Sequence, residues 1–156
     1  MKINSILNTE ELAEKARRWC SYQERCQYEV VLKLKSWGAT SSQLEKVCET
    51  LISEGFIDDQ RFARMYASGK FRNNYWGKLK ITAGLRSKNI DNTLIQEALG
   101  GIDEDEYLQI IKKLVLRKGQ ITGLKNYADR MKIAAYMASK GFESHLIMEI
   151  INNIKS

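Results

Sequence analysis

A pattern that occurs three times restricts the fold of this chain more than any other feature of its sequence. Gly38, Asn89 and Gly141 lie 51 and 52 residues apart, and each closes an amphipathic run. Gly and Asn best tolerate the left-handed backbone that commonly ends a helix. Apolar side chains stand four and eight residues before every anchor, at positions that share one helix face: Val30, Leu34, Ile81, Leu85, Ile133 and Met137. The pattern predicts three amphipathic helices that each end in a tight turn.

Two more helices accompany each of these turns. Apolar residues follow every anchor by six and nine positions, which predicts an amphipathic helix after the turn: Leu44, Val47, Ile95, Ala98, Ile147 and Ile150. Another helical run precedes each pair, at about residues 9–20, 58–72 and 103–118. The chain contains no proline, the residue that interrupts helices most strongly. We therefore predict an all-α fold of about nine helices with no sheet.

These helices group into three tandem three-helix repeats, which we place at residues 1–57, 58–101 and 102–156. A repeat of about 50 residues has a small core, so neighbouring repeats are expected to stack and complete each other's apolar faces. We expect the repeats to form an elongated, curved array.

The composition is that of a water-soluble globular protein. The 156 residues are 44% hydrophobic and 28% charged, which is too apolar for a disordered chain. The first eight residues lack the apolar core of a signal peptide. No stretch approaches the roughly 18 uninterrupted apolar residues of a membrane span. We expect a cytoplasmic monomer without a membrane partner.

The three cysteines do not indicate a metal site. Their number is odd, and the spacing of Cys20 and Cys26 differs from that of a zinc knuckle. The single histidine, His145, is far from them in sequence, and nothing supports its pairing with a cysteine for nucleophilic catalysis. We predict buried or half-buried thiols and no metal.

The acidic clusters are better explained as helix starts than as catalytic groups. Asp58 and Asp59 precede one helical run, and residues 103–106 are all acidic before another. An acidic side chain at this position caps free N–H groups and favours the positive end of the helix dipole. Gly100 and Gly101 belong to no phosphate-binding motif. We predict a protein that is not an enzyme, with no catalytic residue and no cofactor.

The positive charge is concentrated in the central repeat. The net charge is +6, and residues 61–90 hold eight basic side chains and no Asp or Glu. Surface helices normally interleave both signs, so a window of one sign favours a polyanionic partner such as nucleic acid. The eight are Arg61, Arg64, Lys70, Arg72, Lys78, Lys80, Arg86 and Lys88.

A second basic cluster occupies residues 112–132, with Asp129 as its only acid. We take six of its residues as further candidates for contacts with DNA or with a DNA-containing filament: Lys112, Lys113, Arg117, Lys125, Arg130 and Lys132. Tyr75 and Trp76 stand beside Lys78, where a ring can stack on an exposed base. For Trp76 the residues favour a different role, as a hydrophobic staple against the start of the next helix.

The chain resembles the RecX family. Residues 53–63, Ser-Glu-Gly-Phe-Ile-Asp-Asp-Gln-Arg-Phe-Ala, are similar to the family signature, and Gly77-Lys78-Leu79-Lys80-Ile81 resembles its Gly-x-x-(Arg/Lys)-Ile motif. Leu85 and residues 88–90 continue the second motif. Residues of the first repeat are similar as well: Arg25, Glu29, Leu32, Leu34, Trp37 and Gly38. Two positions depart from the pattern, because Gly84 replaces a usual Glu and Asn89 replaces a usual Gly.

This resemblance implies a tandem three-helix-repeat protein that lies in the groove of the RecA–DNA filament. Such proteins limit filament growth and reduce the ATPase, strand-exchange and co-protease activities of RecA. The partners would then be the RecA filament and single- or double-stranded DNA. Gly84 removes a negative charge from the basic face, which favours an anionic partner, although a glycine inside a helix costs about 1 kcal/mol relative to alanine.

Two other functions are compatible with a helical repeat. One is a DNA-binding module that acts without RecA, in which residues 77–99 form a helix-turn-helix. Its second helix, residues 92–99, carries one acid and no base, which is poorly suited to reading a major groove. The other is a helical scaffold for proteins alone, which the acid-free window disfavours.

Overall fold

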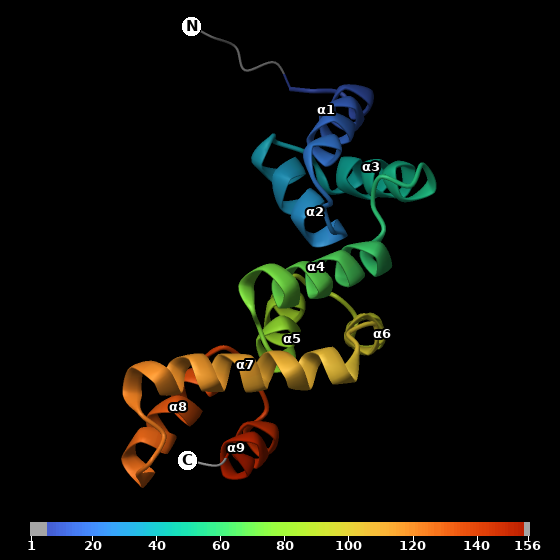
Figure 1. Ribbon diagram of the computed structural model, residues 1–156. Helices are drawn as coiled ribbons and strands as arrows, with labels where there is room; N and C mark the ends of the chain where they lie inside the picture. The colour runs from blue at the N-terminus through green and yellow to red at the C-terminus, as the bar shows by residue number, and fades with distance from the viewer. Residues whose placement is uncertain (1–5, 155–156) are drawn as a thin grey trace, which may run out of the picture. The chain divides into compact units, whose positions relative to one another are not determined.

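The computed structural model describes residues 6–154, and over that range it contains nine α-helices and no strand (Figure 1). This confirms the all-α repeat fold that the sequence predicts. The helices are α1 (Thr9–Tyr22), α2 (Gln27–Ser36), α3 (Ser41–Ser53), α4 (Asp59–Asn74), α5 (Lys78–Ser87), α6 (Asn92–Gly100), α7 (Glu104–Thr122), α8 (Tyr127–Ser139) and α9 (Ser144–Asn153).

The three anchors of the repeat have the backbone that their residue types favour. The φ angles of Gly38, Asn89 and Gly141 are +84°, +55° and +92°, so each ends its helix in the left-handed region. The apolar side chains four and eight residues before them are fully buried, each with 0% relative exposure: Val30, Leu34, Ile81, Leu85, Ile133 and Met137. The periodicity therefore identified the core-facing side of α2, α5 and α8 correctly.

Side-chain caps explain where several helices begin. Asn8, Asp103 and Asn126 each accept a backbone N–H from the third residue of the helix that follows. The Asp58 carboxylate accepts the Arg61 amide at 3.0 Å, which confirms its role as a helix start. Asp59 does something the sequence did not indicate: it accepts the Gln27 amide at the start of α2, at 2.8 Å. One acidic pair thus caps two helices.

The helices pack as two compact units. The first contains the residues up to Ala63 together with residues 88–90, and the second contains residues 64–87 and those from Asp91 onward. In the first unit α1, α2 and α3 pack on one another. Their shared core is aliphatic, with Leu12, Ala16, Val30, Leu34, Val47 and Leu51 each at most 1% exposed.

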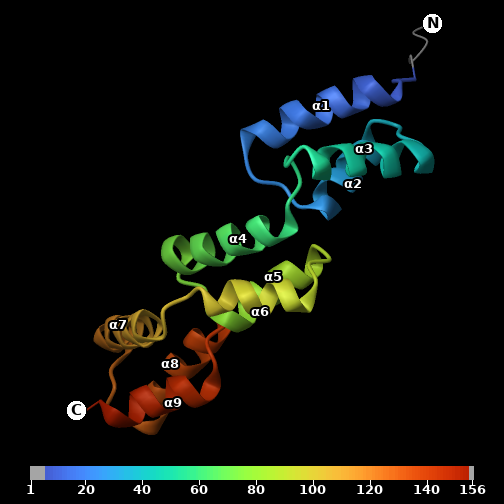
Figure 2. The ribbon, with the colours of Figure 1, turned by 90° about the vertical axis from the view of Figure 1, so that its right-hand side faces the viewer.

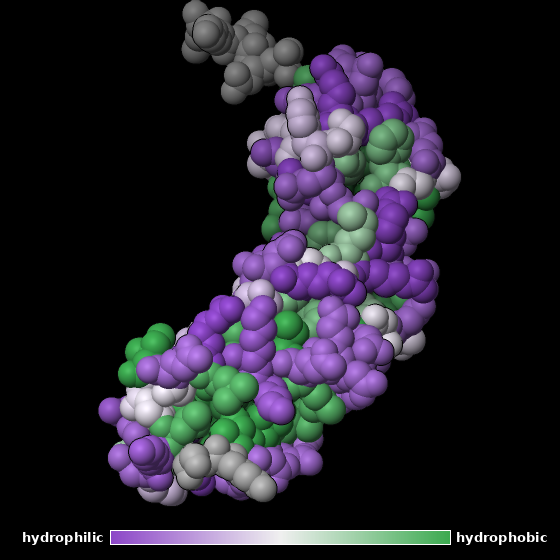
Figure 3. Space-filling view, in the orientation of Figure 1, coloured by the Kyte–Doolittle hydropathy of each residue, from purple (hydrophilic) through white to green (hydrophobic). Residues whose placement is uncertain are grey.

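In the second unit α7 packs against α8 and α9, and α5 packs against α6 (Figure 2). The core of this unit includes a run of aromatic rings. The ring of Tyr107, which is fully buried, lies 5.7 Å from that of Phe71 and 5.5 Å from that of Phe142. On the face drawn in Figure 3, hydrophobic side chains gather over α7, α8 and α9. Leu108 of α7 and Leu146 and Ile150 of α9 line a groove of about 260 Å³.

A backbone contact joins the start of α5 to the end of α8. The Gly77 amide donates to the Lys140 carbonyl at 2.7 Å, and the Leu79 amide donates to the Gly141 carbonyl at 2.9 Å. The approach is so close that a Cβ on Gly77 would lie 2.3 Å from the Gly141 carbonyl group. A Cβ on Gly141 would in turn lie 2.3 Å from the Lys80 Cβ, so space requires a glycine at both positions.

The Tyr107 hydroxyl adds two hydrogen bonds beside this contact. It accepts the Lys78 amide at 3.0 Å and donates to the Glu143 carboxylate. Burial, followed by the hydrogen bond to Glu143, raises the pKa of Tyr107 far above its usual value. The hydroxyl thus remains protonated and links α5, α7 and the start of α9.

The thiols are buried or half-buried, as the sequence predicts. Cys26 and Cys48 are 0% and 5% exposed, and Cys20 is half-buried. Burial raises the pKa of all three thiols, that of Cys26 to about 11. From residue 6 to residue 154, no helix is both long and apolar enough to cross a membrane.

Candidate nucleic-acid interface

Most of the basic side chains in the acid-free window have carboxylate partners in the fold. Five of the eight form ion pairs with acids from outside the window: Arg61 with Glu24 (2.7 Å), Arg64 with Glu97 (2.6 Å), Arg72 with Glu106 (3.5 Å), Lys78 with Glu104 (3.1 Å) and Lys88 with Glu29 (3.2 Å). The partners lie 26 to 59 residues away in sequence. A charge count along the chain therefore overstates how much positive charge this window leaves without a partner.

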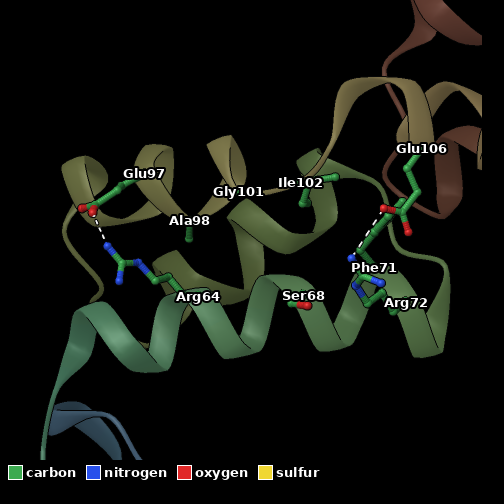
Figure 4. A pocket seen from close by; sticks show the side chains of 9 residues that line it. All are labelled: Arg64, Ser68, Phe71, Arg72, Glu97, Ala98, Gly101, Ile102 and Glu106. Carbon is green, nitrogen blue, oxygen red and sulfur yellow. Dashed lines mark hydrogen bonds and ion pairs between the residues drawn. The ribbon is translucent and has the colours of Figure 1, made fainter.

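Two of these pairs border a groove between α4 and the segment that contains α6 (Figure 4). The groove has a volume of about 240 Å³, and Phe71 and Ala98 are among the residues that line it. The side chains of Arg64 and Arg72 are 59% and 61% exposed. Exposed ion pairs contribute at most about 1 kcal/mol, so a phosphate can compete for either guanidinium group.

Arg61 and Lys78 have mainly structural contacts. Arg61 binds the Glu24 carboxylate and donates to the Gly55 carbonyl at 2.9 Å, so it fastens the end of α3 to the start of α4. The hydrogen bond to Glu24 raises the pKa of the Arg61 guanidinium above its usual value. The Lys78 ammonium lies 4.6 Å from the centre of the Tyr107 ring, and the Lys78 side chain is 23% exposed. Neither group is well placed to meet a large anion.

The three other basic residues of the window, Lys70, Lys80 and Arg86, form no ion pair with any residue that the structure describes. Lys70 and Lys80 both lie over the ring of Trp76, at 4.8 and 4.6 Å from its centre. Arg86 makes a long hydrogen bond of 3.4 Å to the Asn92 side chain. Their charge remains available to an anionic partner.

The loop between α4 and α5 presents two aromatic rings beside these lysines. Tyr75 has φ of +55°, a conformation that costs a non-glycine residue of order 1–3 kcal/mol and is common at functional sites. Its amide donates to the Phe71 carbonyl, and the Trp76 amide donates to the Lys70 carbonyl, both at 3.1 Å. Lys113 of α7 lies 5.7 Å from the Tyr75 ring centre. The strained turn thus fixes both half-buried rings near lysines.

The second basic cluster is less paired than the first. Lys112, Lys113 and Arg117 are exposed on α7, where they line a shallow groove of about 450 Å³ with Leu116. Arg130 donates to the Leu124 carbonyl at 3.0 Å. Lys125 and Lys132 are exposed, and neither forms an ion pair within residues 6–154.

Two lysines that were not among the candidates extend this arrangement. Lys118 and Lys140 lie over the Tyr136 ring, at 4.6 and 5.9 Å from its centre. The Lys140 ammonium also donates to the Asn74 carbonyl at 3.3 Å, next to Tyr75. Lys118 belongs to the basic cluster in the sequence, whereas Lys140 stands alone there. The only feature of the sequence that could have identified Lys140 is its position four residues after Tyr136, one helical turn along the same face.

We use the name lysine–aromatic surface for Lys70, Lys80, Lys113, Lys118 and Lys140 with Tyr75, Trp76 and Tyr136. All eight residues belong to the second unit, and their ring and hydrogen-bond contacts connect α4 and α5 to α7 and α8. None of the five ammonium groups has a carboxylate partner in the described part of the chain. Lysines interleaved with aromatic rings are typical of surfaces that bind nucleic acid.

Comparisons with known proteins match this architecture to one family. Residues 58–99 match the model of the family domain described as RecX, second three-helix domain, and residues 104–151 match RecX, third three-helix domain. The regulatory protein RecX of Chlorobium phaeobacteroides is 30% identical over 141 residues, which cover 89% of this chain and 90% of that protein. That of Lactobacillus johnsonii is 28% identical over 84% of this chain, which spans 49% of the longer protein.

Solved structures agree with these sequence matches. The crystal structure of RecX from Lactobacillus salivarius superposes with a TM-score of 0.85 at 23% identity, over 92% of this chain and 94% of that one. A crystal structure of a regulatory protein RecX superposes with a TM-score of 0.81 at 25% identity, over 93% of this chain and 74% of that one. The fold and the order of the repeats are thus shared.

Proposed function

Because this chain belongs to the RecX family, we propose that it is a regulator that binds the RecA–DNA filament and inhibits RecA. The inhibition would act on the recombinase, ATPase and co-protease activities by occupying the filament groove. No bond is made or broken by the regulator in this proposal, so it acts without catalysis. The family supports the partner, and the chain's own residues support the mode of contact.

The observation that carries the proposal is the lysine–aromatic surface. Five ammonium groups without carboxylate partners form one patch of positive charge on the second unit. A nucleoprotein filament is a polyanion, so it attracts such a patch over several ångströms at physiological salt. The five ion-paired basic residues of the central window would contribute less, because an anion must first displace a carboxylate.

Sedimentation with preformed filaments tests this mode of contact. The protein is mixed with RecA assembled on single-stranded DNA with a slowly hydrolysed ATP analogue, and the filaments are collected by centrifugation. We expect the natural chain to sediment with them, and a variant with Lys70, Lys80 and Lys113 changed to Glu to remain mostly in solution. A matched variant with Lys15, Lys35 and Lys46 changed to Glu reverses the same charge in the first unit. Equal sedimentation of all three proteins would contradict the proposed surface.

A DNA-binding module that needs no RecA is the second candidate, and the same surface favours it. The helix-turn-helix version has little support, because α6 has no basic residue and its Glu97 is engaged by Arg64. Affinity separates the two functions. A module of this kind binds bare DNA as tightly as it binds filaments, whereas a RecA regulator prefers filaments at equal DNA concentration.

A further inference from the structure

We propose that Trp76 is a stacking site for an unpaired base of single-stranded nucleic acid, and that Lys70 or Lys80 uncovers the ring by moving to a phosphate. This inference deepens the proposed contact with the filament, and rests on it for the presence of nucleic acid. It concerns one ring and the two lysines on it. A free oligonucleotide is enough to test it.

The ring of Trp76 is held in place by its surroundings. Tyr66 of α4 meets it edge-on, with the ring centres 6.4 Å apart and the planes at 73°. The Trp76 amide is fixed by the Lys70 carbonyl, and the strained backbone of Tyr75 precedes it. A ring that is already ordered loses little freedom when a base stacks on it.

Gly84 is what allows this arrangement. A Cβ at position 84 would lie 2.1 Å from the Tyr66 hydroxyl oxygen, so any larger residue would push Tyr66 away from its position. This gives a physical reason for a glycine in the middle of α5. Gly84 leaves space for the Tyr66 side chain, and the Tyr66 ring in turn packs against Trp76.

Movement of either lysine can expose the face of the Trp76 ring. Lys70 and Lys80 lie 4.8 and 4.6 Å from the ring centre, and neither ammonium has a carboxylate partner within residues 6–154. An ammonium that moves from a ring to a phosphate exchanges a weak contact for a stronger one. The ring face that it leaves is then free for a base. The same side chains thus supply the phosphate contact and control access to the stacking surface.

A single strand fits this site and a duplex does not. The bases of a duplex are stacked and paired inside the helix, so a surface ring cannot reach their faces without paying to extrude one. A single strand offers its bases freely, with a phosphate on either side of each. Stacking of this kind is tolerant of sequence, because every base has a π face.

Fluorescence provides the direct test. The chain has three tryptophans, and in a Trp19→Phe/Trp37→Phe variant Trp76 is the only one left. Titration with a thymidine 12-mer is expected to quench its emission at saturation, and a 12-base-pair duplex at the same salt is expected to leave it nearly unchanged. Equal quenching by the duplex would overturn the assignment to single strands, and no quenching by the bound 12-mer would overturn the stacking.

Affinity measurements on the otherwise natural chain give a second, independent test. We expect Trp76→Leu to weaken binding of a labelled thymidine 12-mer by roughly 5- to 150-fold, the range found for base–aromatic stacking. The slope of log affinity against log salt should stay the same, because no phosphate contact is lost. A Lys70→Gln/Lys80→Gln variant should reduce that slope by about 0.7 if one of the two lysines contacts a phosphate and by about 1.4 if both do, since each contact to a single strand contributes about 0.7; an unchanged slope would contradict the move to a phosphate. Circular dichroism establishes that each variant is folded.

Tyr127→Leu is the matched control, because Tyr127 is 77% exposed on α8 and lies outside the lysine–aromatic surface. It should bind the 12-mer as the natural chain does. If Trp76→Leu also binds as tightly, the stacking site is wrong. These assays contain no RecA, so they test the stacking site separately from the proposed function. If Trp76 stacks as expected but the protein has no effect on RecA, only the proposed function is contradicted.

Discussion

Substitution of Gly77 by alanine tests the contact between α5 and α8 most sharply. The new Cβ would lie 2.3 Å from the carbonyl carbon and oxygen of Gly141 and 2.4 Å from the Phe142 amide nitrogen. Ordinary contacts of this kind are at least 3.4 Å, so the two segments must separate by about 1 Å. That movement breaks the two backbone hydrogen bonds that Gly77 and Leu79 donate, at 2.7 and 2.9 Å.

The expected cost follows from those two bonds. An amide that loses its partner in the folded chain costs about 1–3 kcal/mol, so the loss of two such bonds should lower the free energy of unfolding of Gly77→Ala by about 2–6 kcal/mol. This is a large part of the 5–15 kcal/mol that typically stabilises a domain. Urea unfolding followed by circular dichroism at 222 nm measures the loss.

Gly69 provides the matched control. It lies inside α4, and a Cβ there would meet nothing within 4 Å. Because alanine is the better helix former, Gly69→Ala should raise the free energy of unfolding by about 0.5–1 kcal/mol. If the free energy of unfolding of Gly77→Ala differs from that of the natural chain by less than about 0.5 kcal/mol, the close backbone contact does not exist in solution and the reasoning is refuted.

Three further predictions follow from single groups. Tyr107→Phe removes the acceptor of the Lys78 amide and should cost about 1–3 kcal/mol in urea unfolding; an unchanged midpoint would show that the hydroxyl is not needed there. Burial raises the pKa of Cys26 to about 11. The contribution of the protonated Cys26 thiol to the free energy of unfolding is therefore full below about pH 9 and is lost as the pH rises through 11. Thiol-specific reagents at pH 8 should therefore modify Cys26 only as fast as the chain opens, and rapid modification of the folded protein would contradict its burial. Arg61→Ala should lower the unfolding free energy by about 1–2 kcal/mol through loss of the bonds to Glu24 and Gly55, while Arg86→Ala should change it by less than about 0.5 kcal/mol.

The helices could be predicted from the sequence because their signals are local. Positions four and eight residues before Gly38, Asn89 and Gly141 depend only on helical geometry, and their burial is the direct result. The caps Asp58 and Asp103 are local as well. The curvature of the array and the repeat boundaries depend on how repeats meet, and they stay predictions.

The candidate site was predicted less completely, because ion pairing is not local. Nothing near Arg64 in the sequence indicates that it will pair with Glu97, and nothing near Lys88 indicates that it will pair with Glu29. In the same way, Lys140 has no basic neighbours in the sequence, and only the fold brings it beside Asn74 and Tyr136. The contact of Gly77 with Gly141 joins residues 64 positions apart, and a glycine in a turn gives no sign of it.

ATP hydrolysis by RecA on single-stranded DNA tests the central claim most directly. The protein is added to preformed filaments, from well below one molecule to one molecule per RecA protomer, at physiological salt. A RecX-type regulator should lower the rate of hydrolysis progressively, and the variant with Lys70, Lys80 and Lys113 changed to Glu should lower it much less. A rate that stays constant up to equimolar protein would contradict the assignment of this chain as an inhibitor of RecA.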